Sequence, residues 1–275
     1  MVEEIEKNET EEVICVSNLV KKFNNFTAID DISFSVGSGE IFAFLGPNGA
    51  GKTTTIKILI TLLNPTSGTG TIGGYDVTSD SSKIRRIIGY VSQMVSVDGA
   101  LTAYENLKLM ANLYDIPERD QDERINAILK FFDLENNANF LVRNFSGGMV
   151  RKLEIGQAIL HRPKVLFLDE PTVGLDPIAK QNVWKHLIEL NKKFNTTLFF
   201  TTHIMEEVED FSTRVAIMNR GKISAIDTVD NLKRKTGKKD ATLEDAFLFF
   251  AGNSLSETGD FHSIRQNRMM ERRRG

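Results

Sequence analysis

One segment constrains this chain more than any other. The apolar run Ile41–Leu45 leads into Gly46-Pro47-Asn48-Gly49-Ala50-Gly51-Lys52-Thr53, which fits the pattern G-x-x-x-x-G-K-[ST]. Apolar residues at helical spacing then follow over residues 56–63. A strand, a glycine-rich loop and a helix in this order let backbone N–H groups converge on a polyphosphate at the positive end of the helix. The sequence therefore predicts a binding loop for a purine nucleoside triphosphate.

Two side chains of this loop have separate expected roles. Lys52 would place its charge on the terminal phosphates, and the Thr53 hydroxyl would ligate Mg²⁺. A turn that merely joins a strand to a helix is disfavoured, because the fixed positions and both flanks agree. The residues expected to contact the nucleotide here are Gly46, Pro47, Asn48, Gly49, Ala50, Gly51, Lys52, Thr53 and Thr54.

A second apolar run ends in two acids. Residues 165–168 are all apolar, and Asp169 and Glu170 follow them. Carboxylates at the C-terminal end of a buried parallel strand lie at the ligand crevice of an α/β sheet. Asp169 is therefore expected to hold Mg²⁺, and Glu170 to polarise an attacking water. An acid that caps a helix is the alternative for either residue, and it is disfavoured in a chain that also has the phosphate loop.

Strand and helix patterns alternate along the chain, which favours a parallel sheet with helices packed on it. Between about residues 102 and 160 the pattern is helical only, so this block is interpreted as an insertion into an α/β core. The expected organisation is a flexible N-terminus (1–12), a nucleotide-binding domain (13–225, with the helical insertion at about 96–160), a short C-terminal extension (226–252) and a disordered basic tail (253–275).

The composition excludes several classes of protein. The chain has 34 basic and 37 acidic residues and a net charge of −3, so no general attraction to nucleic acid is expected. A single cysteine precludes an intrachain disulfide. No apolar run approaches the roughly 20 residues that cross a bilayer, and the acidic N-terminus is unlike a signal peptide. We expect a cytosolic chain without a nucleic-acid partner.

Several motifs together resemble the ATP-binding subunits of ABC (ATP-binding cassette) transporters, over about residues 13–221. They follow the family order: the phosphate loop at 46–53, a glutamine loop at 90–93, a signature at 146–148, the acidic strand at 165–170, a D-loop at 174–176 and a switch histidine at 203. The signature departs from the common form, because Phe145 precedes it and Met149 follows it where Leu and Gln are usual. The form Ser-Gly-Gly-Met resembles the drug-exporter (daunorubicin-resistance-like) branch, which works with ABC-2-type membrane subunits.

The resemblance implies a P-loop NTPase (RecA-like) core with an antiparallel β subdomain and an inserted helical subdomain. It implies that Phe23 stacks on adenine and that Gln93 contacts Mg²⁺ and the attacking water. It also implies that His203 binds the γ-phosphate and holds Glu170 in place. The catalytic residues would thus be Glu170, His203, Lys52 and Gln93. The Mg²⁺ ligands would be Thr53, Gln93 and Asp169.

The resemblance further implies a head-to-tail dimer, in which each ATP lies between the phosphate loop of one subunit and residues Ser146, Gly147, Gly148 and Asp176 of the other. The second subunit would make a homodimer or a heterodimer. Hydrolysis would power export of a small molecule, drug or lipid through separate integral membrane permease subunits, at the cytoplasmic face of the membrane. Gln93, residues 94–102 and the first inserted helix would grip the permease.

Three other functions compete with this interpretation. One is a non-transport ABC ATPase that acts on a macromolecule, and this alternative stays open. A P-loop kinase or GTPase is disfavoured because it explains neither residues 146–148 nor His203. A nucleotide-binding regulator without turnover is disfavoured by the intact Glu170.

Overall fold

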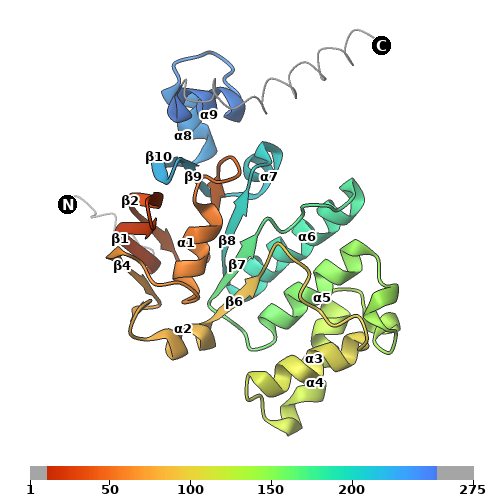
Figure 1. The fold of residues 1–275 in the computed structure, drawn as a ribbon. Helices are drawn as coiled ribbons and strands as arrows, with labels where there is room; N and C mark the ends of the chain where they lie inside the picture. Colours follow the sequence, from red (N-terminus) through yellow and green to blue (C-terminus); the bar gives the residue numbers. More distant parts are fainter. Residues whose placement is uncertain (1–10, 253–275) are drawn as a thin grey trace, which may run out of the picture.

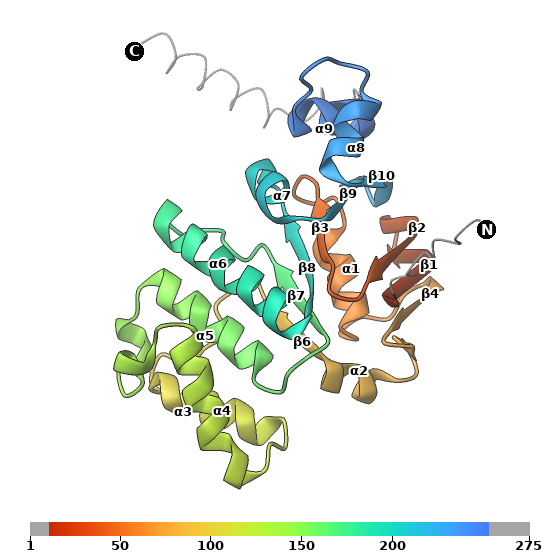
Figure 2. The ribbon, with the colours of Figure 1, turned by 180° about the vertical axis from the view of Figure 1, so that it is seen from behind.

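The computed structural model describes residues 11–252 of the chain (Figures 1 and 2). Almost all of the expected flexible N-terminus (1–12) and the whole expected basic tail (253–275) therefore lie outside the described residues. Within residues 11–252, none of the helices has both the length and the apolarity that a bilayer span requires.

A six-stranded sheet forms the centre of the molecule, in the order β10-β9-β3-β8-β7-β6. Five strands are parallel and β10 is antiparallel to β9. The alternation of strand and helix patterns predicted such a sheet, and this prediction is confirmed. Its strands are β3 (Ile41–Leu45), β6 (Ile88–Val91), β7 (Val165–Asp169), β8 (Thr197–Thr202), β9 (Arg214–Asn219) and β10 (Lys222–Asp227).

A second, four-stranded sheet is antiparallel throughout, in the order β2-β1-β4-β5. Helix α1 lies between this sheet and the central one (Figure 1). The antiparallel β subdomain implied by the family resemblance is therefore present. Its strands are β1 (Glu12–Phe23), β2 (Phe26–Gly37), β4 (Ser67–Ile72) and β5 (Tyr75–Asp76).

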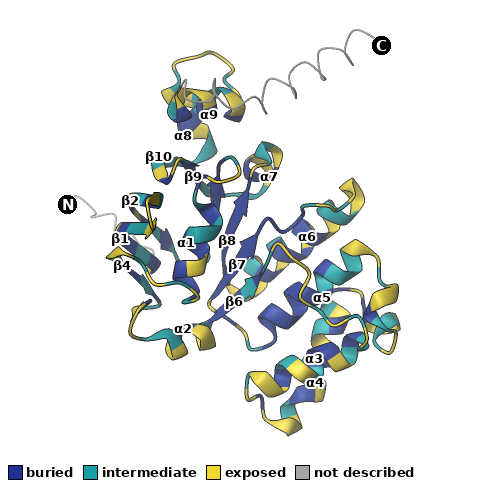
Figure 3. Ribbon diagram, in the orientation of Figure 1, coloured by how far each residue is buried: buried dark blue, intermediate teal, exposed yellow. Residues whose placement is uncertain are grey.

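Strands β3, β7 and β8 of the central sheet are buried on both faces, so their side chains divide between two cores (Figure 3). In β3, Ile41, Ala43 and Leu45 join the core beneath the helices that lie between residues 103 and 251. Phe42 and Phe44 point the other way and join the core shared with the antiparallel sheet and α1. This explains why β3 is an uninterrupted apolar run rather than an alternating one.

The helices include three that connect β6 to β7: α3 (Ala103–Leu113), α4 (Glu118–Phe131) and α5 (Gly147–Ile159). They lie together beside the sheet (Figure 2), and only two short 3-10 turns accompany them, which agrees with the helical block predicted at about residues 102–160. The remaining helices are α1 (Lys52–Leu59), α2 (Ser81–Ile87), α6 (Pro177–Phe194), α7 (Met205–Phe211), α8 (Val229–Lys235) and α9 (Leu243–Ala251).

The C-terminal part contains more regular structure than the sequence indicated. Helix α9 (Leu243–Ala251) lies in the C-terminal extension expected at residues 226–252. Strand β10 and helix α8 were not predicted, because their half-buried patterns give only weak periodicity. Strand β10 also crosses the expected boundary at residues 225 and 226, so the C-terminal extension continues directly from the sheet.

Candidate nucleotide site

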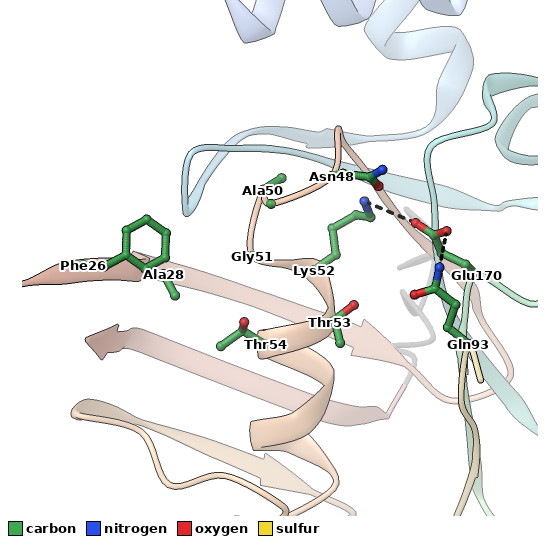
Figure 4. Close-up of a pocket in the computed structure, with 11 residues that line it drawn as sticks. Phe26, Ala28, Asn48, Ala50, Gly51, Lys52, Thr53, Thr54, Gln93 and Glu170 are labelled. Carbon is green, nitrogen blue, oxygen red and sulfur yellow. Dashed lines mark hydrogen bonds and ion pairs between the residues drawn. The ribbon is translucent and has the colours of Figure 1, made fainter. Parts of the chain in front are cut away.

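The glycine-rich loop lies between β3 and α1, at the C-terminal edge of the central sheet (Figure 4). Two of its glycines are required by close packing. A Cβ on Gly46 would lie 2.2 Å from the Met218 carbonyl oxygen. Gly51 has a φ of +108°, and a Cβ there would lie 2.6 Å from the Ala28 carbonyl oxygen. The loop can therefore take this shape only with glycine at both positions.

The Lys52 side chain folds back onto the loop and binds its backbone. Its Nζ donates to the carbonyl oxygens of Gly46 (2.8 Å) and Pro47 (3.1 Å) and lies 3.8 Å from Glu170 Oε1. Burial lowers the pKa of Lys52, and the nearby Glu170 and Asp169 carboxylates oppose this shift. The ammonium group is thus buried, with a carboxylate as its nearest countercharge.

Asp169 ends β7 as a buried carboxylate, 1% exposed. Its Oδ1 accepts hydrogen bonds from Thr53 Oγ1 (3.0 Å) and Thr201 Oγ1 (2.6 Å). The first of these bonds joins α1 to β7, so the predicted metal ligands Thr53 and Asp169 do lie side by side. Hydroxyl and carboxylate oxygens are hard ligands of the kind that Mg²⁺ prefers.

Glu170 is held in a strained backbone conformation, with a φ of +50°. A non-glycine residue in this region costs about 1–3 kcal/mol, and such strain is common at functional sites. The Glu170 N–H donates to both the carbonyl and the hydroxyl oxygen of Thr201, at 3.2 and 3.1 Å. The neighbouring strand β8 therefore fixes the direction in which the Glu170 side chain leaves the backbone.

Gln93 and His203 approach the two carboxylate oxygens of Glu170 from different segments. Gln93 Nε2 is 3.4 Å from Oε2, and His203 Nδ1 is 3.2 Å from Oε1. The hydrogen bond with His203 is the main cause that lowers the pKa of Glu170, against its burial. Glu170 is therefore ionised at neutral pH. The Gln93 amide oxygen points to the side of Thr53 in Figure 4.

A cavity of about 410 Å³ opens in front of the loop. Eight of the sixteen predicted nucleotide ligands line it, together with two residues that the sequence analysis missed, Phe26 and Ala28. Phe23, the expected adenine contact, is not among the lining residues. Lys21 Nζ lies over its ring, 5.0 Å from the ring centroid. The residues that line the cavity are Phe26, Ala28, Asn48, Gly49, Ala50, Gly51, Lys52, Thr53, Thr54, Gln93 and Glu170.

Gly46, Pro47 and His203 lie outside the lining of this cavity, and the four predicted residues of the signature and the D-loop form a second group. Ser146, Gly148 and Asp176 line a separate cavity of about 260 Å³, and Gly147 is the first residue of α5. Ser146 caps α5 by accepting from Met149 N (3.3 Å), and Asp176 caps α6 by accepting from Ala179 N (2.9 Å). The helix N-termini of α5 and α6 thus face the same cavity, with partial positive charge available to an anion.

The segment that contains Gln93 is attached to α5 by hydrogen bonds to a buried ion pair within that helix. Arg151 Nη1 donates to the Ser92 carbonyl oxygen (2.8 Å) and lies 3.1 Å from Glu154 Oε2. Glu154 Oε1 in turn accepts from Ser96 N at 2.6 Å. Helix α5 therefore connects the two groups of residues mechanically, because it begins at the second cavity and holds the loop of Gln93.

The donors that Thr53, Asp169 and Gln93 offer to a metal ion are oxygen atoms, the ligands that Mg²⁺ prefers. Within residues 11–252, no group of three or more His, Cys, Asp or Glu side chains is arranged to hold a metal ion. Mg²⁺ usually keeps several waters and binds through one or two carboxylates and the phosphates of the substrate. Thr53, Asp169 and the Gln93 amide oxygen would be the protein ligands of an ion bound in this way.

Comparison with known proteins assigns these motifs to a family. The sequence model of the ABC transporter family matches residues 29–173, which contain the phosphate loop, Gln93, the signature and Glu170. The chain belongs to the ABC transporter family. This cassette shares 38% identity over 247 residues with the probable multidrug ABC transporter ATP-binding protein YbhF of Escherichia coli. The alignment covers 89% of the cassette but only 42% of YbhF.

Other relatives are covered over a larger share of their own length. It is 39% identical over 221 residues to the daunorubicin/doxorubicin resistance ATP-binding protein DrrA of Streptomyces peucetius, covering 80% of the cassette and 67% of DrrA. A solved ATP-binding subunit of an ABC transporter is 31% identical, with a TM-score of 0.78 over 87% of the cassette and 100% of that chain. A dimeric ATP-binding cassette in a post-hydrolysis state, bound to ADP and Pi, is 25% identical, with a TM-score of 0.69 over 78% of the cassette and 98% of that chain.

Proposed function

We propose that this cassette hydrolyses ATP and that two copies of it power export of a drug, lipid or other small molecule through separate permease subunits. The observation that carries the proposal is the pair Glu170 and Lys52 in the cavity of the phosphate loop, with an ionised carboxylate beside a buried ammonium group. The named relatives YbhF and DrrA, a probable multidrug protein and a drug-resistance protein, support the export assignment.

The residues of the site divide the work of hydrolysis. Lys52 and the loop N–H groups bind the phosphates, and Glu170 accepts a proton from the attacking water. Gln93 and His203 hold the Glu170 carboxylate in position. Thr53, Asp169 and Gln93 would hold Mg²⁺, which supplies charge neutralisation on the transferring phosphoryl group.

Two copies are proposed because each copy contains two half-sites. Ser146, Gly148 and Asp176 line a cavity that shares no residue with the cavity of the phosphate loop. In a head-to-tail pair, the phosphate-loop cavity of each copy faces the Ser146 cavity of its partner. Two identical copies therefore complete two sites. ATP then favours the closed pair through its γ-phosphate, and hydrolysis removes that preference.

The proposed permease contact is the segment after Gln93 and helix α3, at the cytoplasmic face of the membrane. Large apolar side chains are exposed on both: Met94 (81%) and Val95 (65%) in the segment, and Leu109 (47%) and Leu113 (67%) on α3. A photo-crosslinking residue at Met94 is expected to capture an integral membrane protein in the cells of origin, whereas one at Leu62, which is also exposed (64%), is not. A crosslink to the membrane protein from Leu62 and none from Met94 would place the contact elsewhere.

The residues that line the cavity indicate which aromatic side chain contacts the base. Phe26 lines the cavity and Phe23 does not, so Phe26→Ala should weaken ATP binding more than Phe23→Ala. Loss of aromatic stacking on a base costs about 1–3 kcal/mol, which corresponds to about a 5- to 150-fold rise in Kd. Titration of a fluorescent ATP analogue measures both variants against the wild type. The reverse order would assign the base contact to Phe23, as the family resemblance implies.

A further inference from the structure

Thr202 connects the phosphate loop to the switch histidine. It is the last residue of β8, 1% exposed, and it directly precedes His203. Its carbonyl oxygen accepts from Gly46 N at 3.3 Å. Its hydroxyl accepts from Ile204 N (3.0 Å) and donates to Glu207 Oε2 (2.8 Å). The position of His203 therefore depends on what holds the Thr202 hydroxyl.

Glu207 is the carboxylate that holds it. This side chain is 5% exposed in the first turn of α7. Its other oxygen, Oε1, accepts from the Thr172 hydroxyl, and Thr172 is itself 1% exposed. Among the ion pairs within residues 11–252, none involves Glu207, so the two threonine hydroxyls are the donors that satisfy it there. Burying a carboxylate without a cation is costly, and packing alone gives no reason for it.

The two threonines belong to the two segments that meet at Glu170. Thr172 follows Glu170 by two residues, in the turn after its strained backbone. Thr202 precedes His203 by one residue. The contact between His203 Nδ1 and Glu170 Oε1, at 3.2 Å, joins the same two segments. Glu207 thus ties them together a second time, behind the reacting groups and outside the nucleotide cavity.

We propose that Glu207 is a positioning residue for hydrolysis, which fixes the segment of Glu170 against the segment of His203. The inference rests on the proposed ATPase function. Because Glu207 lines no part of the nucleotide cavity, its loss changes the orientation of Glu170 and His203 without removing a contact to ATP. A misplacement of about 1 Å in a catalytic group can cost about 100-fold in rate.

The test compares the kcat and the ATP Kd of Glu207→Ala and Glu207→Gln in the purified full chain. Glu207→Ala removes both hydrogen bonds, and its kcat should fall about 10- to 100-fold with a Kd within about twofold of the wild type. Glu207→Gln should recover most of the rate, since the amide can accept from one hydroxyl and donate to the other. Should Glu207→Ala fail to fold, Thr172→Val removes one of the two bonds at nearly constant volume.

Gln121→Ala is the matched control, because Gln121 is also a buried polar residue (4% exposed) with two hydrogen bonds, but it lies in α4. Equal falls in kcat for the folded Gln121→Ala and Glu207→Ala chains would overturn the positioning role, as would a fall in ATP affinity that parallels the fall in kcat. If the wild type is active and the Glu207→Ala chain has the same kcat, only the positioning role of Glu207 is overturned. A wild type that binds but does not hydrolyse ATP overturns the proposed function itself.

Discussion

Replacing Glu170 with Gln is expected to lower the rate of ATP hydrolysis by about 100- to 10,000-fold and to leave ATP bound. The amide has nearly the same shape as the carboxylate but cannot accept the proton of the attacking water. The amide oxygen can keep the contact with Gln93 Nε2, and the amide N–H can donate to His203 Nδ1 where that ring nitrogen is the acceptor, so the architecture of the site should persist. Phosphate release under single-turnover conditions measures the rate, and a fluorescent ATP analogue measures binding.

Glu123→Gln is the control for this substitution, because it replaces a carboxylate by an amide at an exposed position of α4. It should keep the rate and the affinity of the wild type. A Glu170→Gln chain that turns over ATP as fast as Glu123→Gln would show that another group accepts the proton.

Replacing Lys52 with Ala is expected to weaken ATP binding by about 10- to 100-fold, because a hydrogen bond to a charged group is worth about 1.5–3 kcal/mol. Lys52 is the buried ammonium group in the cavity, and without it the carboxylates of Asp169 and Glu170 repel the phosphates. Isothermal titration calorimetry measures the affinity directly.

Lys57→Ala provides the matched comparison for Lys52. Lys57 belongs to the same helix, α1, but is exposed and does not line the cavity. The Lys57→Ala chain should bind ATP like the wild type. Similar losses in the two variants would point to a general effect of charge or helix stability rather than to a phosphate contact by Lys52.

The local parts of the fold and site could be predicted from the sequence. The apolar run before Gly46 and the helical spacing after Thr53 predicted β3 and α1, because a backbone that wraps a phosphate leaves few choices of residue. The acids after a second apolar run were likewise predicted at the edge of the sheet, and Asp169 does reach Thr53. In both cases the signal lies within a few consecutive residues.

Features that depend on distant contacts could not be predicted in this way. Thr53 and Asp169 are 116 residues apart, and Thr172 and Glu207 are 35 apart. Phe26 was missed because the register of β1 against β2 decides whether Phe26 or Phe23 lines the cavity, and this register cannot be read from the sequence. Helices α2 and α7 were missed because each has only 7 residues, too few to show a periodic apolar face.

In the proposed pair, one ATP is held by the phosphate loop of one copy and the signature of the other. A mixing experiment tests it most directly, with Lys52→Ala and Ser146→Arg chains that should each be inactive alone. In a head-to-tail pair of one chain of each kind, one site is doubly impaired and the other is intact, so an equal mixture should regain about a quarter of the wild-type ATPase rate. A mixture that stays as inactive as its two components would contradict the claim, because a site completed within a single copy cannot be restored by a partner.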